Sequence, residues 1–267
     1  MGKPLNKLKK SLRKRGLLLG GEDVEAGHRF GLDGTLGLHF VEEIESGRKV
    51  YVSDEKRLKI YRGGIDHRQK WILGDYRIPL DLIRPGDVML DVGANVGEMG
   101  IWVEASGGKY IAFEPDPTAF KALQQNVSGD LYDIALSDTN GSAVFYLNSA
   151  EADSSLFKPQ EAHGEITVRK VRLDDFLAEV GAPERLRLLK IEAEGMEPEV
   201  LAGSTDTLKR SEYVAVDAGP ERGGENTVPD VLNALTGLDF EVLDCFLVRG
   251  TFLLRNRAAA NGDPNPQ

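Results

Sequence analysis

Residues 91–100 read Asp91-Val-Gly-Ala-Asn-Val-Gly-Glu-Met-Gly100, and the chain on both sides is organised around them. The apolar run Val88-Met-Leu90 just before them is long enough for the buried end of a central strand. Gly93 and Gly97 then mark a turn, and an apolar helical pattern starts at Met99. A strand that ends at glycines and enters a helix brings backbone N–H groups close to a ligand, at the positive end of the helix. The stretch therefore predicts a ligand-binding turn.

A second short strand ends in Glu114, which lies 21 residues after Gly93. A βαβ unit presents a carboxylate to the ribose hydroxyls of an adenosine ligand at about this distance. A dinucleotide turn would read G-x-G-x-x-G, but Asn95 and Glu98 occupy the second and third glycine positions. Asp91 suits a ligand with a cationic end, such as the amino group and sulfonium of S-adenosylmethionine. The pattern favours this donor over a dinucleotide, and an ordinary turn made by the glycines is the alternative.

The bulk properties exclude several classes of protein. The chain has 267 residues, which is enough for one large α/β domain and an N-terminal extension. Its formal net charge of −10 argues against a general nucleic-acid binder, which would show a basic face. The single cysteine, Cys245, excludes an internal disulfide and suits a reducing compartment. No apolar run approaches the ~20 residues of a membrane-spanning helix, so we expect a cytoplasmic protein.

Residues 3–15 break the acidic pattern, because they carry seven Lys and Arg residues and no acid. Leu5, Leu8 and Leu12 share a helical face. Such a segment can lie on an anionic membrane surface or dock on a protein partner, and a solvated tail is the favoured alternative. We assign residues 1–20 to a basic tail or amphipathic helix.

Residues 21–84 predict a small β-rich cap in front of the main domain. Val50-Tyr-Val52 reads as a short strand, and Leu58-Lys-Ile-Tyr61 alternates with the period of another. His67 and Arg68 can face the active site and hold an anionic or hydroxylated acceptor. A surface role fits these two residue types equally well.

The main domain, residues 85–257, alternates strands with helices, which indicates an α/β fold. Further strands are predicted at 131–136, 143–147, 166–171, 187–192 and 213–216, and helices at 117–127, 173–179, 198–209 and 228–236. An antiparallel pair, 240–246 and 251–256, closes the domain. The tail 258–267 is rich in Asn, Pro and Gly, which predicts disorder.

Several predicted strands end in acidic residues. They are Asp91, Glu114, Glu192 with Glu194, and Asp217. In open α/β sheets the ligand lies beyond the carboxyl ends of the strands, at the switch in strand order, so we expect these acids to border one crevice. A single acid at a strand end is usually a helix cap or solvated, but convergence of several on one rim favours a site. Asp133 lies near the end of the third predicted strand, where the adenine edge of a donor would lie.

Six pieces in order resemble one protein family. They are Asp91-Val-Gly-Ala-Asn-Val-Gly97, Phe113-Glu-Pro-Asp-Pro117, Ala135-Leu-Ser-Asp138, Ser154-Ser-Leu156, Leu173-Asp-Asp175 and Leu189-Lys-Ile-Glu-Ala-Glu-Gly195. Together they resemble S-adenosylmethionine-dependent methyltransferases of the FkbM family. The family usually has K-I-D-V-E-G where this chain has Lys190-Ile-Glu-Ala-Glu-Gly195, and a glutamate where Asp217 stands. Each departure keeps the charge and moves the carboxylate by one methylene.

The resemblance implies a Rossmann-like class I methyltransferase fold, with a seven-stranded, mostly parallel sheet and an antiparallel C-terminal hairpin. It also implies O-methylation of a hydroxyl on a sugar or glycan, or on a polyketide or similar small molecule. Ile60-Tyr-Arg-Gly-Gly64 and Gly74-Asp-Tyr76 further resemble family members of glycan modification. The candidate donor-binding residues are Asp91, Gly93, Asn95, Gly97, Glu114 and Asp133.

The sulfonium methyl is already activated, so the enzyme must align the acceptor oxygen and remove its proton. Glu192 and Glu194 are the candidate bases. Lys190 either orients one of them or contacts the carboxylate of the donor, and a structural ion pair is the alternative. No His, Cys and Asp spacing argues for a metal, although clustered acids can hold Mg²⁺.

Two other functions stay open at this point. A degenerate fold of this kind can serve as a non-catalytic scaffold or binding subunit that docks through its basic N-terminus. The intact donor pattern argues against this, since a scaffold needs neither Asp91 nor Glu114. A nicotinamide-dependent oxidoreductase is disfavoured by the missing second glycine.

Overall fold

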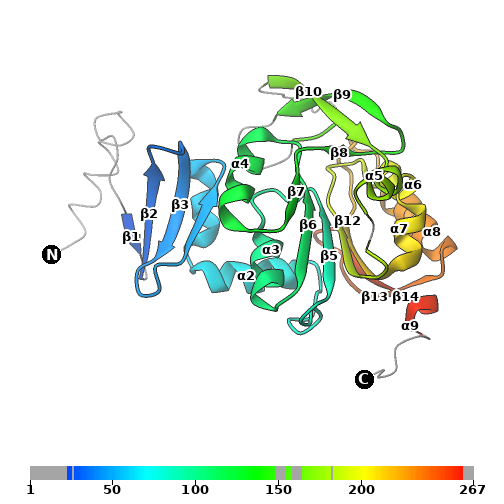
Figure 1. Cartoon of the computed structure of the whole chain (residues 1–267), viewed down its shortest axis with the longest axis horizontal. Helices are drawn as coiled ribbons and strands as arrows, with labels where there is room; N and C mark the ends of the chain where they lie inside the picture. Colours follow the sequence, from blue (N-terminus) through cyan, green and yellow to red (C-terminus); the bar gives the residue numbers. More distant parts are fainter. Residues whose placement is uncertain (1–22, 26, 148–153, 158–163, 182, 261–267) are drawn as a thin grey trace.

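The computed structural model describes residues 23–25, 27–147, 154–157, 164–181 and 183–260 (Figure 1). The basic segment 1–20 and residues 261–267 of the predicted tail lie outside these ranges. The first tail residues belong to a short helix, α9 (Arg257–Ala260). No helix within the described ranges is long and apolar enough to cross a membrane.

The main domain is built on a seven-stranded sheet in the order β13-β14-β12-β11-β5-β6-β7 (Figure 1). Its strands are β5 (Val88–Val92), β6 (Lys109–Phe113), β7 (Asp130–Tyr132), β11 (Leu186–Ile191), β12 (Ser211–Asp217), β13 (Phe240–Phe246) and β14 (Thr251–Asn256). β14 runs antiparallel to β12 and β13, while β7, β6, β5, β11 and β12 pair in parallel. The predicted Rossmann-like sheet with its antiparallel C-terminal hairpin is confirmed.

Helices cover both faces of this sheet, which is why its central strands consist largely of apolar residues. On one face lie α2 (Ile65–Asp75), α3 (Glu98–Ala105) and α4 (Pro117–Asn126), and on the other lie α5 (Leu173–Val180), α6 (Glu197–Ala202), α7 (Thr205–Arg210) and α8 (Val228–Gly237). The six residues of β11 are all buried. Leu188 packs toward the first face and Leu189 toward the second, as expected for successive residues of a strand.

The strand order switches between β5 and β11. The chain leaves β5 toward β6 and β7, and it later builds β11 and β12 on the opposite side. β5 and β11 pair in a register that sets Lys190 opposite Asp91 and Ile191 opposite Val92. Their carboxyl ends therefore form the switch point at which open α/β sheets bind ligands.

The predicted strand 131–136 is wrong as a single strand. β7 ends at Tyr132, and β8 (Ala135–Leu136) joins a separate sheet with β9 (Gly141–Leu147) and β10 (Gly164–Val171), in the order β8-β10-β9. Ile134, Ala135 and Leu136 are buried one after another, at 4–5% exposure. The chain crosses between two sheets here, so neither face of this segment reaches water.

The predicted helix 198–209 is two helices, α6 and α7, that break at Gly203. A Cβ at Gly203 would lie 2.1 Å from the carbonyl oxygen of Ser137, so the backbones approach too closely for any other residue. The carboxylate of Asp174 then accepts the N–H groups of Asp206 (2.9 Å) and Thr207 (2.8 Å) and caps the first turn of α7. The cap comes from another helix, which the local sequence does not indicate.

The N-terminal part is a four-stranded antiparallel sheet followed by two helices. Its elements are β1 (Asp23–Glu25), β2 (His28–Asp33), β3 (Leu38–Glu43), β4 (Lys49–Val52), the 3₁₀ helix η1 (Glu55–Tyr61) and α2. The predicted strand 58–61 is wrong, because it belongs to η1. The Asp54 side chain accepts the N–H of Lys56 at 2.7 Å and starts that helix.

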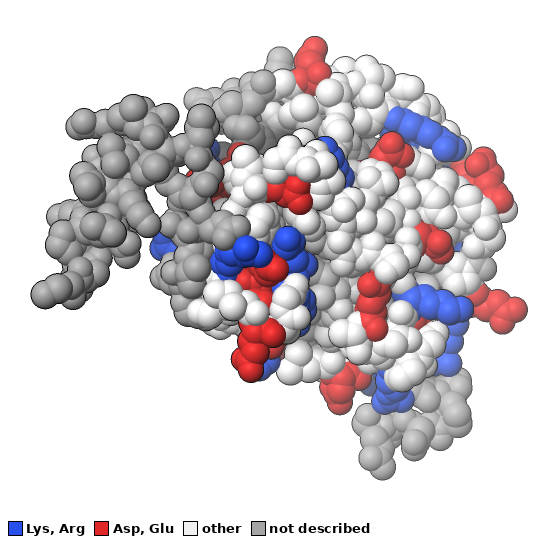
Figure 2. Space-filling view, turned by 60° about the vertical axis from the view of Figure 1, so that its left-hand side comes forward, with Lys and Arg blue, Asp and Glu red and all other residues white. Residues whose placement is uncertain are grey.

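Asn126, at the end of α4, joins this sheet to the main domain. Its side-chain oxygen accepts the N–H of Tyr51 in β4 at 2.8 Å, and its side-chain nitrogen donates to the Tyr51 carbonyl at 2.9 Å. Figure 2, which brings the N-terminal side of the molecule forward, shows acidic and basic side chains interspersed among the described residues.

Candidate active site

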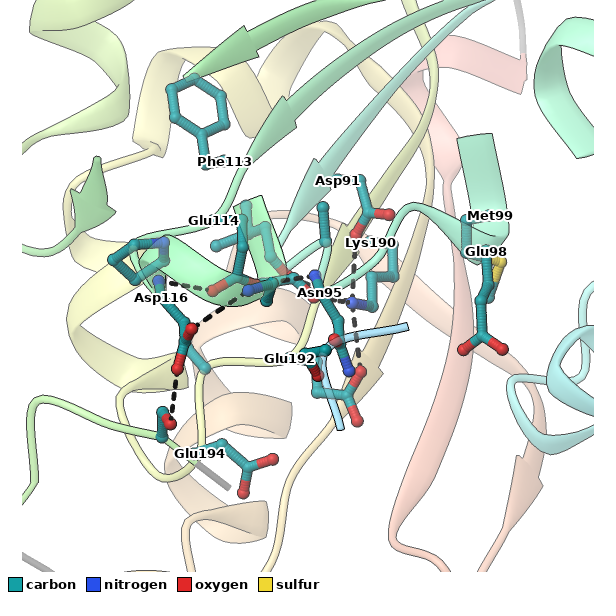
Figure 3. A pocket seen from close by; sticks show the side chains of 18 of the residues that line it. Asp91, Asn95, Glu98, Met99, Phe113, Glu114, Asp116, Lys190, Glu192 and Glu194 are labelled. Atoms are coloured by element: carbon teal, nitrogen blue, oxygen red, sulfur yellow. Dashed lines mark hydrogen bonds and ion pairs between the residues drawn. The ribbon is translucent and has the colours of Figure 1, made fainter. Parts of the chain in front are cut away.

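A cavity of about 520 Å³ lies beyond the carboxyl ends of β5, β6 and β11 (Figure 3). This volume falls within the usual range of small-molecule sites, about 300–1,000 Å³. The turn after β5, the end of β6 and the loop after β11 supply one part of the lining. η1 and α2 of the N-terminal part, together with Arg249, supply another part. The start of α4, residues 134–136, β9 and residues 154 and 156 complete the lining. The switch point of the sheet is therefore hollow, as the strand-end acids predict.

The turn after β5 needs its glycines for geometric reasons. Gly93, Asn95 and Gly97 all have positive φ, at 71°, 49° and 83°. A Cβ on Gly93 would lie 1.9 Å from the backbone oxygen of Glu192. The Asn95 side-chain oxygen is buried and finds no hydrogen-bond partner among the described residues. The turn thus combines an unpaired hydrogen-bond acceptor, on Asn95, with a backbone at Gly93 that lies very close to the backbone of Glu192.

Glu114, at the end of β6, is held by the same turn. Its Oε2 accepts the N–H of Asn95 at 2.7 Å, and its Oε1 accepts the N–H of Asp116 at 2.8 Å (Figure 3). Burial raises the pKa of Glu114 to about 7, and the nearby charge of Asp116 acts in the same direction, while the two N–H donors act against it. The carboxylate borders the cavity in a fixed orientation.

Lys190 lies at the centre of a buried charge cluster. Its Nζ is 3.0 Å from Asp91 Oδ1, 3.1 Å from Glu192 Oε2 and 2.7 Å from the Gly93 carbonyl oxygen (Figure 3). Burial acts to lower the pKa of Lys190, but the charges of Asp91 and Glu192 raise it above the ordinary value. The ammonium therefore stays charged and ties the turn after β5 to Glu192.

Asp91 itself is 1% exposed, and both of its carboxylate oxygens have a partner in the protein. Its Oδ2 accepts the hydroxyl of Tyr110 at 2.6 Å, and its Oδ1 faces Lys190. Burial raises the pKa of Asp91, and the charge of Lys190 opposes this. Although Asp91 lines the cavity, its hydrogen bonds go to the protein in this structure.

Glu192 and Glu194 both line the cavity, in different surroundings. Glu192 faces Lys190, and Arg249 Nη2 lies 3.8 Å from its Oε1. Burial acts to raise the pKa of Glu192, but the Lys190 charge, the Tyr76 hydroxyl and the Arg249 charge hold it below the ordinary value. Glu194 has a φ of 49°, and its carbonyl accepts the hydroxyl of Ser155 at 2.8 Å. Glu192 is therefore ionised at neutral pH.

Two residues singled out from the sequence lie elsewhere. Asp133 is exposed and does not line the cavity, whereas its neighbours Ile134 and Ala135 do. Asp217 is 8% exposed and does not line the cavity, but its Oδ2 lies 3.2 Å from Nη2 of Arg249, which does. Burial, with the charge of Glu192, raises the pKa of Asp217 to about 7.

Sequence reasoning missed Glu98, which it noted only as the residue in the third glycine position. Glu98 is 6% exposed at the start of α3. Arg68 holds its carboxylate at 2.6 and 2.7 Å, and the Tyr61 hydroxyl donates to it at 2.6 Å. Burial acts to raise the pKa of Glu98, but the Arg68 charge lowers it overall. Of the two residues expected near an acceptor, Arg68 lines the cavity and His67 is exposed outside it.

Among the charged side chains of the lining, carboxylates outnumber cations. The carboxylates are Asp54, Asp75, Asp91, Glu98, Glu114, Asp116, Glu192 and Glu194, and the cations are Arg57, Arg68, Lys190 and Arg249. Within the described ranges, no group of three or more His, Cys, Asp or Glu side chains is arranged to hold a metal ion. The excess of negative charge favours a cationic ligand.

The family described as Methyltransferase FkbM domain matches residues 91–242, which include the turn after β5, Glu114 and Glu192. The chain belongs to this family of S-adenosylmethionine-dependent methyltransferases. Its sheet is that of the class I methyltransferases, and its methyl donor is S-adenosylmethionine.

Three characterised proteins are similar in sequence. 2-O-methyltransferase NoeI of Sinorhizobium fredii is 27% identical over 77% of this chain and 94% of its own length. 31-O-demethyl-FK506 methyltransferase FkbM of Streptomyces tacrolimicus is 34% identical over 46% of this chain and 62% of its own. Hexuronic acid methyltransferase AglP of Haloferax volcanii is 28% identical over 55% of this chain and 65% of its own length. A solved rRNA methylase of Streptococcus thermophilus is 14% identical, covers 68% of this chain and 93% of its own, and has a TM-score of 0.40.

The cavity fits the donor in charge and in hydrogen-bonding capacity. S-adenosylmethionine carries an ammonium and a sulfonium, which suit a lining with excess carboxylate. The unpaired Asn95 oxygen and the Glu114 carboxylate offer acceptors to amino and hydroxyl groups.

Proposed function

We propose that this protein is an O-methyltransferase that transfers the methyl group of S-adenosylmethionine to a hydroxyl of a sugar, a glycan or a related small molecule. One observation carries the proposal: Glu192, an ionised carboxylate, borders the same cavity as the donor turn and is fixed to that turn through Lys190. A hydroxyl acceptor needs such a group, because its oxygen must lose a proton as the new bond forms.

The donor-binding roles in this proposal follow the structure. Glu114 binds the ribose hydroxyls, and its two N–H contacts to Asn95 and Asp116 hold it in position. Gly93 and Gly97 allow the backbone of the turn to approach the donor. Asp91 acts mainly through its charge, because Tyr110 and Lys190 occupy its oxygens. Ile134 and Ala135 take the adenine side that we first assigned to Asp133.

The chemical step then needs alignment and a base. The bound donor supplies a methyl group that is already activated by its sulfonium. Glu192 or Glu194 orients the acceptor hydroxyl and takes its proton while the oxygen–carbon bond forms and the sulfur–carbon bond breaks. Lys190 keeps the Glu192 side chain in place. The products are a methyl ether, S-adenosylhomocysteine and the proton held by the carboxylate.

The names of NoeI and FkbM support a hydroxyl acceptor, and the name of AglP supports a sugar, without fixing the class of acceptor. NoeI is named a 2-O-methyltransferase, AglP a hexuronic acid methyltransferase, and FkbM acts on 31-O-demethyl-FK506. A sugar hydroxyl is our first choice of acceptor, and a polyketide hydroxyl is the second.

The proposal is tested with isotopically labelled donor. Calorimetry should first show that the purified protein binds S-adenosylmethionine. Labelled methyl transfer is then screened over nucleotide sugars, free glycans and polyketide alcohols, with ether products identified by mass spectrometry. Donor binding without transfer to any hydroxyl would contradict the proposal and favour a non-catalytic binding subunit.

A further inference from the structure

Part of the cavity lies beyond the donor residues, where α2 and the turn before β14 form its wall. Trp71 and Asp75 come from α2, Tyr76 follows that helix, and Arg249 comes from the turn. None of these residues belongs to the donor pattern. We propose that this wall is the acceptor subsite and that it takes a neutral pyranose ring, with Trp71 as the stacking surface and Asp75 and Arg249 as partners for its hydroxyls. The inference rests on the proposed function and narrows its substrate class.

Trp71 provides a flat apolar surface at the cavity. The residue is 47% exposed although it lines the cavity, so about half of it is in contact with water. Covering such a surface with the C–H face of a sugar ring removes apolar area from water. A sugar ring that covers Trp71 therefore gains binding free energy from this apolar contact.

The Trp71 ring packs against a side chain that is itself fixed. The Arg68 guanidinium lies 4.7 Å from the centre of the ring. Arg68 is 7% exposed and is held by two hydrogen bonds to Glu98, at 2.6 and 2.7 Å. A stacking surface that is already ordered costs less conformational entropy when the ligand binds.

Polar groups beside the ring suit hydroxyls, which donate and accept hydrogen bonds. Asp75 is 7% exposed and lines the cavity one helical turn beyond Trp71. Arg249 reaches the same region, with its side chain 44% exposed and Nη2 3.8 Å from Glu192. Because Arg249 lies this close to Glu192, the subsite adjoins the candidate base.

The charge of the lining selects against an acidic sugar. The cations close to this wall already face carboxylates: Arg68 faces Glu98, and Arg249 faces Asp217 and Glu192. A carboxylate on the acceptor would therefore add negative charge next to Asp75 and Glu192 in a partly buried site, which is unfavourable. A neutral ring avoids this repulsion. We expect the acceptor to differ in this respect from a hexuronic acid.

Fluorescence gives a direct binding test, because the chain has only two tryptophans and the other, Trp102, is 6% exposed. The protein loaded with S-adenosylhomocysteine is titrated with neutral methyl glycosides of glucose, galactose, mannose and fucose, and with the methyl glycosides of glucuronic and galacturonic acid. At least one neutral glycoside should change the emission, and each uronate should bind at least ~10-fold more weakly. Equal binding of the uronates, or no response to any neutral glycoside, would overturn the inference. The change in emission is assigned to Trp71 because it should be lost in Trp71→Phe, which retains Trp102.

A kinetic test uses whichever acceptor the transfer screen identifies. Trp71→Ala should raise the acceptor KM about 10-fold or more and leave the donor Kd unchanged, while Trp71→Phe should keep most of the acceptor affinity. Val180→Ala is the matched control, since Val180 is 49% exposed and lies outside the cavity lining. If methyl transfer occurs and Trp71→Ala has a wild-type KM, this inference fails while the proposed function stands. If no hydroxyl accepts methyl, the proposed function fails, this wall is not an acceptor subsite, and the titration shows only whether it binds a neutral sugar.

Discussion

Lys190 and Asp91 are paired twice, once through the backbone and once through their side chains. They stand opposite each other in the parallel register of β11 and β5, and Lys190 Nζ lies 3.0 Å from Asp91 Oδ1. The two side chains are 3% and 1% exposed. A third group, Glu192, shares the ammonium from the cavity side. The Lys190 ammonium therefore holds the turn after β5 and the Glu192 carboxylate together as one unit.

Removal of the lysine charge tests this unit. Lys190→Met should lower the free energy of unfolding by about 3–5 kcal/mol, because it leaves the buried Asp91 carboxylate without its counter-charge. Urea unfolding measures the loss, and adding Asp91→Asn should restore part of it. Lys209→Met is the control, since Lys209 pairs with Asp206 on the surface and should have little effect. A Lys190→Met protein as stable as the wild type would show that the cluster contributes nothing to folding.

The choice between the two candidate bases is a kinetic question. Glutamine keeps the size of the side chain and removes most of its basicity, so the substitution at the true base should lower the rate of methyl transfer by ~10²–10⁴-fold with donor affinity little changed. Single-turnover assays of Glu192→Gln and Glu194→Gln on an identified acceptor measure this. Wild-type rates in both variants would mean that catalysis is alignment alone or that another group takes the proton.

Donor binding should depend on pH through Glu114. Its pKa of about 7, raised by burial, means that the carboxylate is partly protonated near neutrality. The ionised form accepts ribose hydroxyls more strongly, so donor affinity should rise from pH 6 to pH 8. Glu114→Ala should weaken binding by ~1–3 kcal/mol and flatten this dependence. Calorimetry at pH 6, 7 and 8 is the measurement, and an unchanged affinity in the folded variant would contradict the assignment.

The same raised pKa has the opposite effect on folding. Between the ordinary pKa of 4.5 and about 7, the native Glu114 binds more protons than the unfolded chain does. Its contribution to the free energy of unfolding therefore falls as pH rises through this window. Asp217, with a pKa raised from 3.8 to about 7, acts in the same direction. We expect the wild-type protein without donor to lose more stability from pH 5 to pH 7.5 than Asp217→Asn does, as measured by chemical unfolding.

Two glycines with similar backbone angles should respond differently to alanine. Gly93 has a φ of 71° and a Cβ there would meet the Glu192 carbonyl at 1.9 Å, whereas Gly86 has a φ of 88° and nothing within 4 Å. Gly86→Ala should cost only the ~1–2 kcal/mol of a left-handed residue. Gly93→Ala should in addition displace the turn and weaken donor binding at least ~10-fold. Calorimetry and urea unfolding of both variants compare the two, and equal effects would show that the close approach is unimportant.

The sequence was sufficient for the sheet because the central strands are apolar runs that end in acids. That pattern placed Asp91, Glu114 and Glu192 at strand ends, and the fold brings all three to one cavity. Short segments whose pattern fits more than one structure were harder to predict. Leu58–Tyr61 alternates like a strand, but the Asp54 cap makes it helical. Short apolar runs of this kind fit either structure until their neighbours are known.

The Arg68–Glu98 pair shows what sequence patterns cannot supply. The two residues are 30 positions apart and belong to helices of different parts of the molecule. Each is a charged residue of a type that usually lies on the surface, so neither indicates burial by itself. Their partnership depends on where α2 packs against α3. This wall of the cavity was therefore predicted only in part: the sequence named Arg68 as a residue that can face the site, but it did not indicate the partner Glu98.

The bond between Asn126 and Tyr51 has a consequence for synthesis. β4 is an edge strand, and its outer backbone groups would otherwise offer a template for pairing with another chain. The side chain that satisfies them lies 75 residues further along. Translation at about 5–20 residues per second leaves that edge open for roughly 4–15 s after Tyr51 is made. During this interval the outer N–H and C=O of Tyr51 lack this partner, and Asn126→Ala would remove it from the folded protein as well.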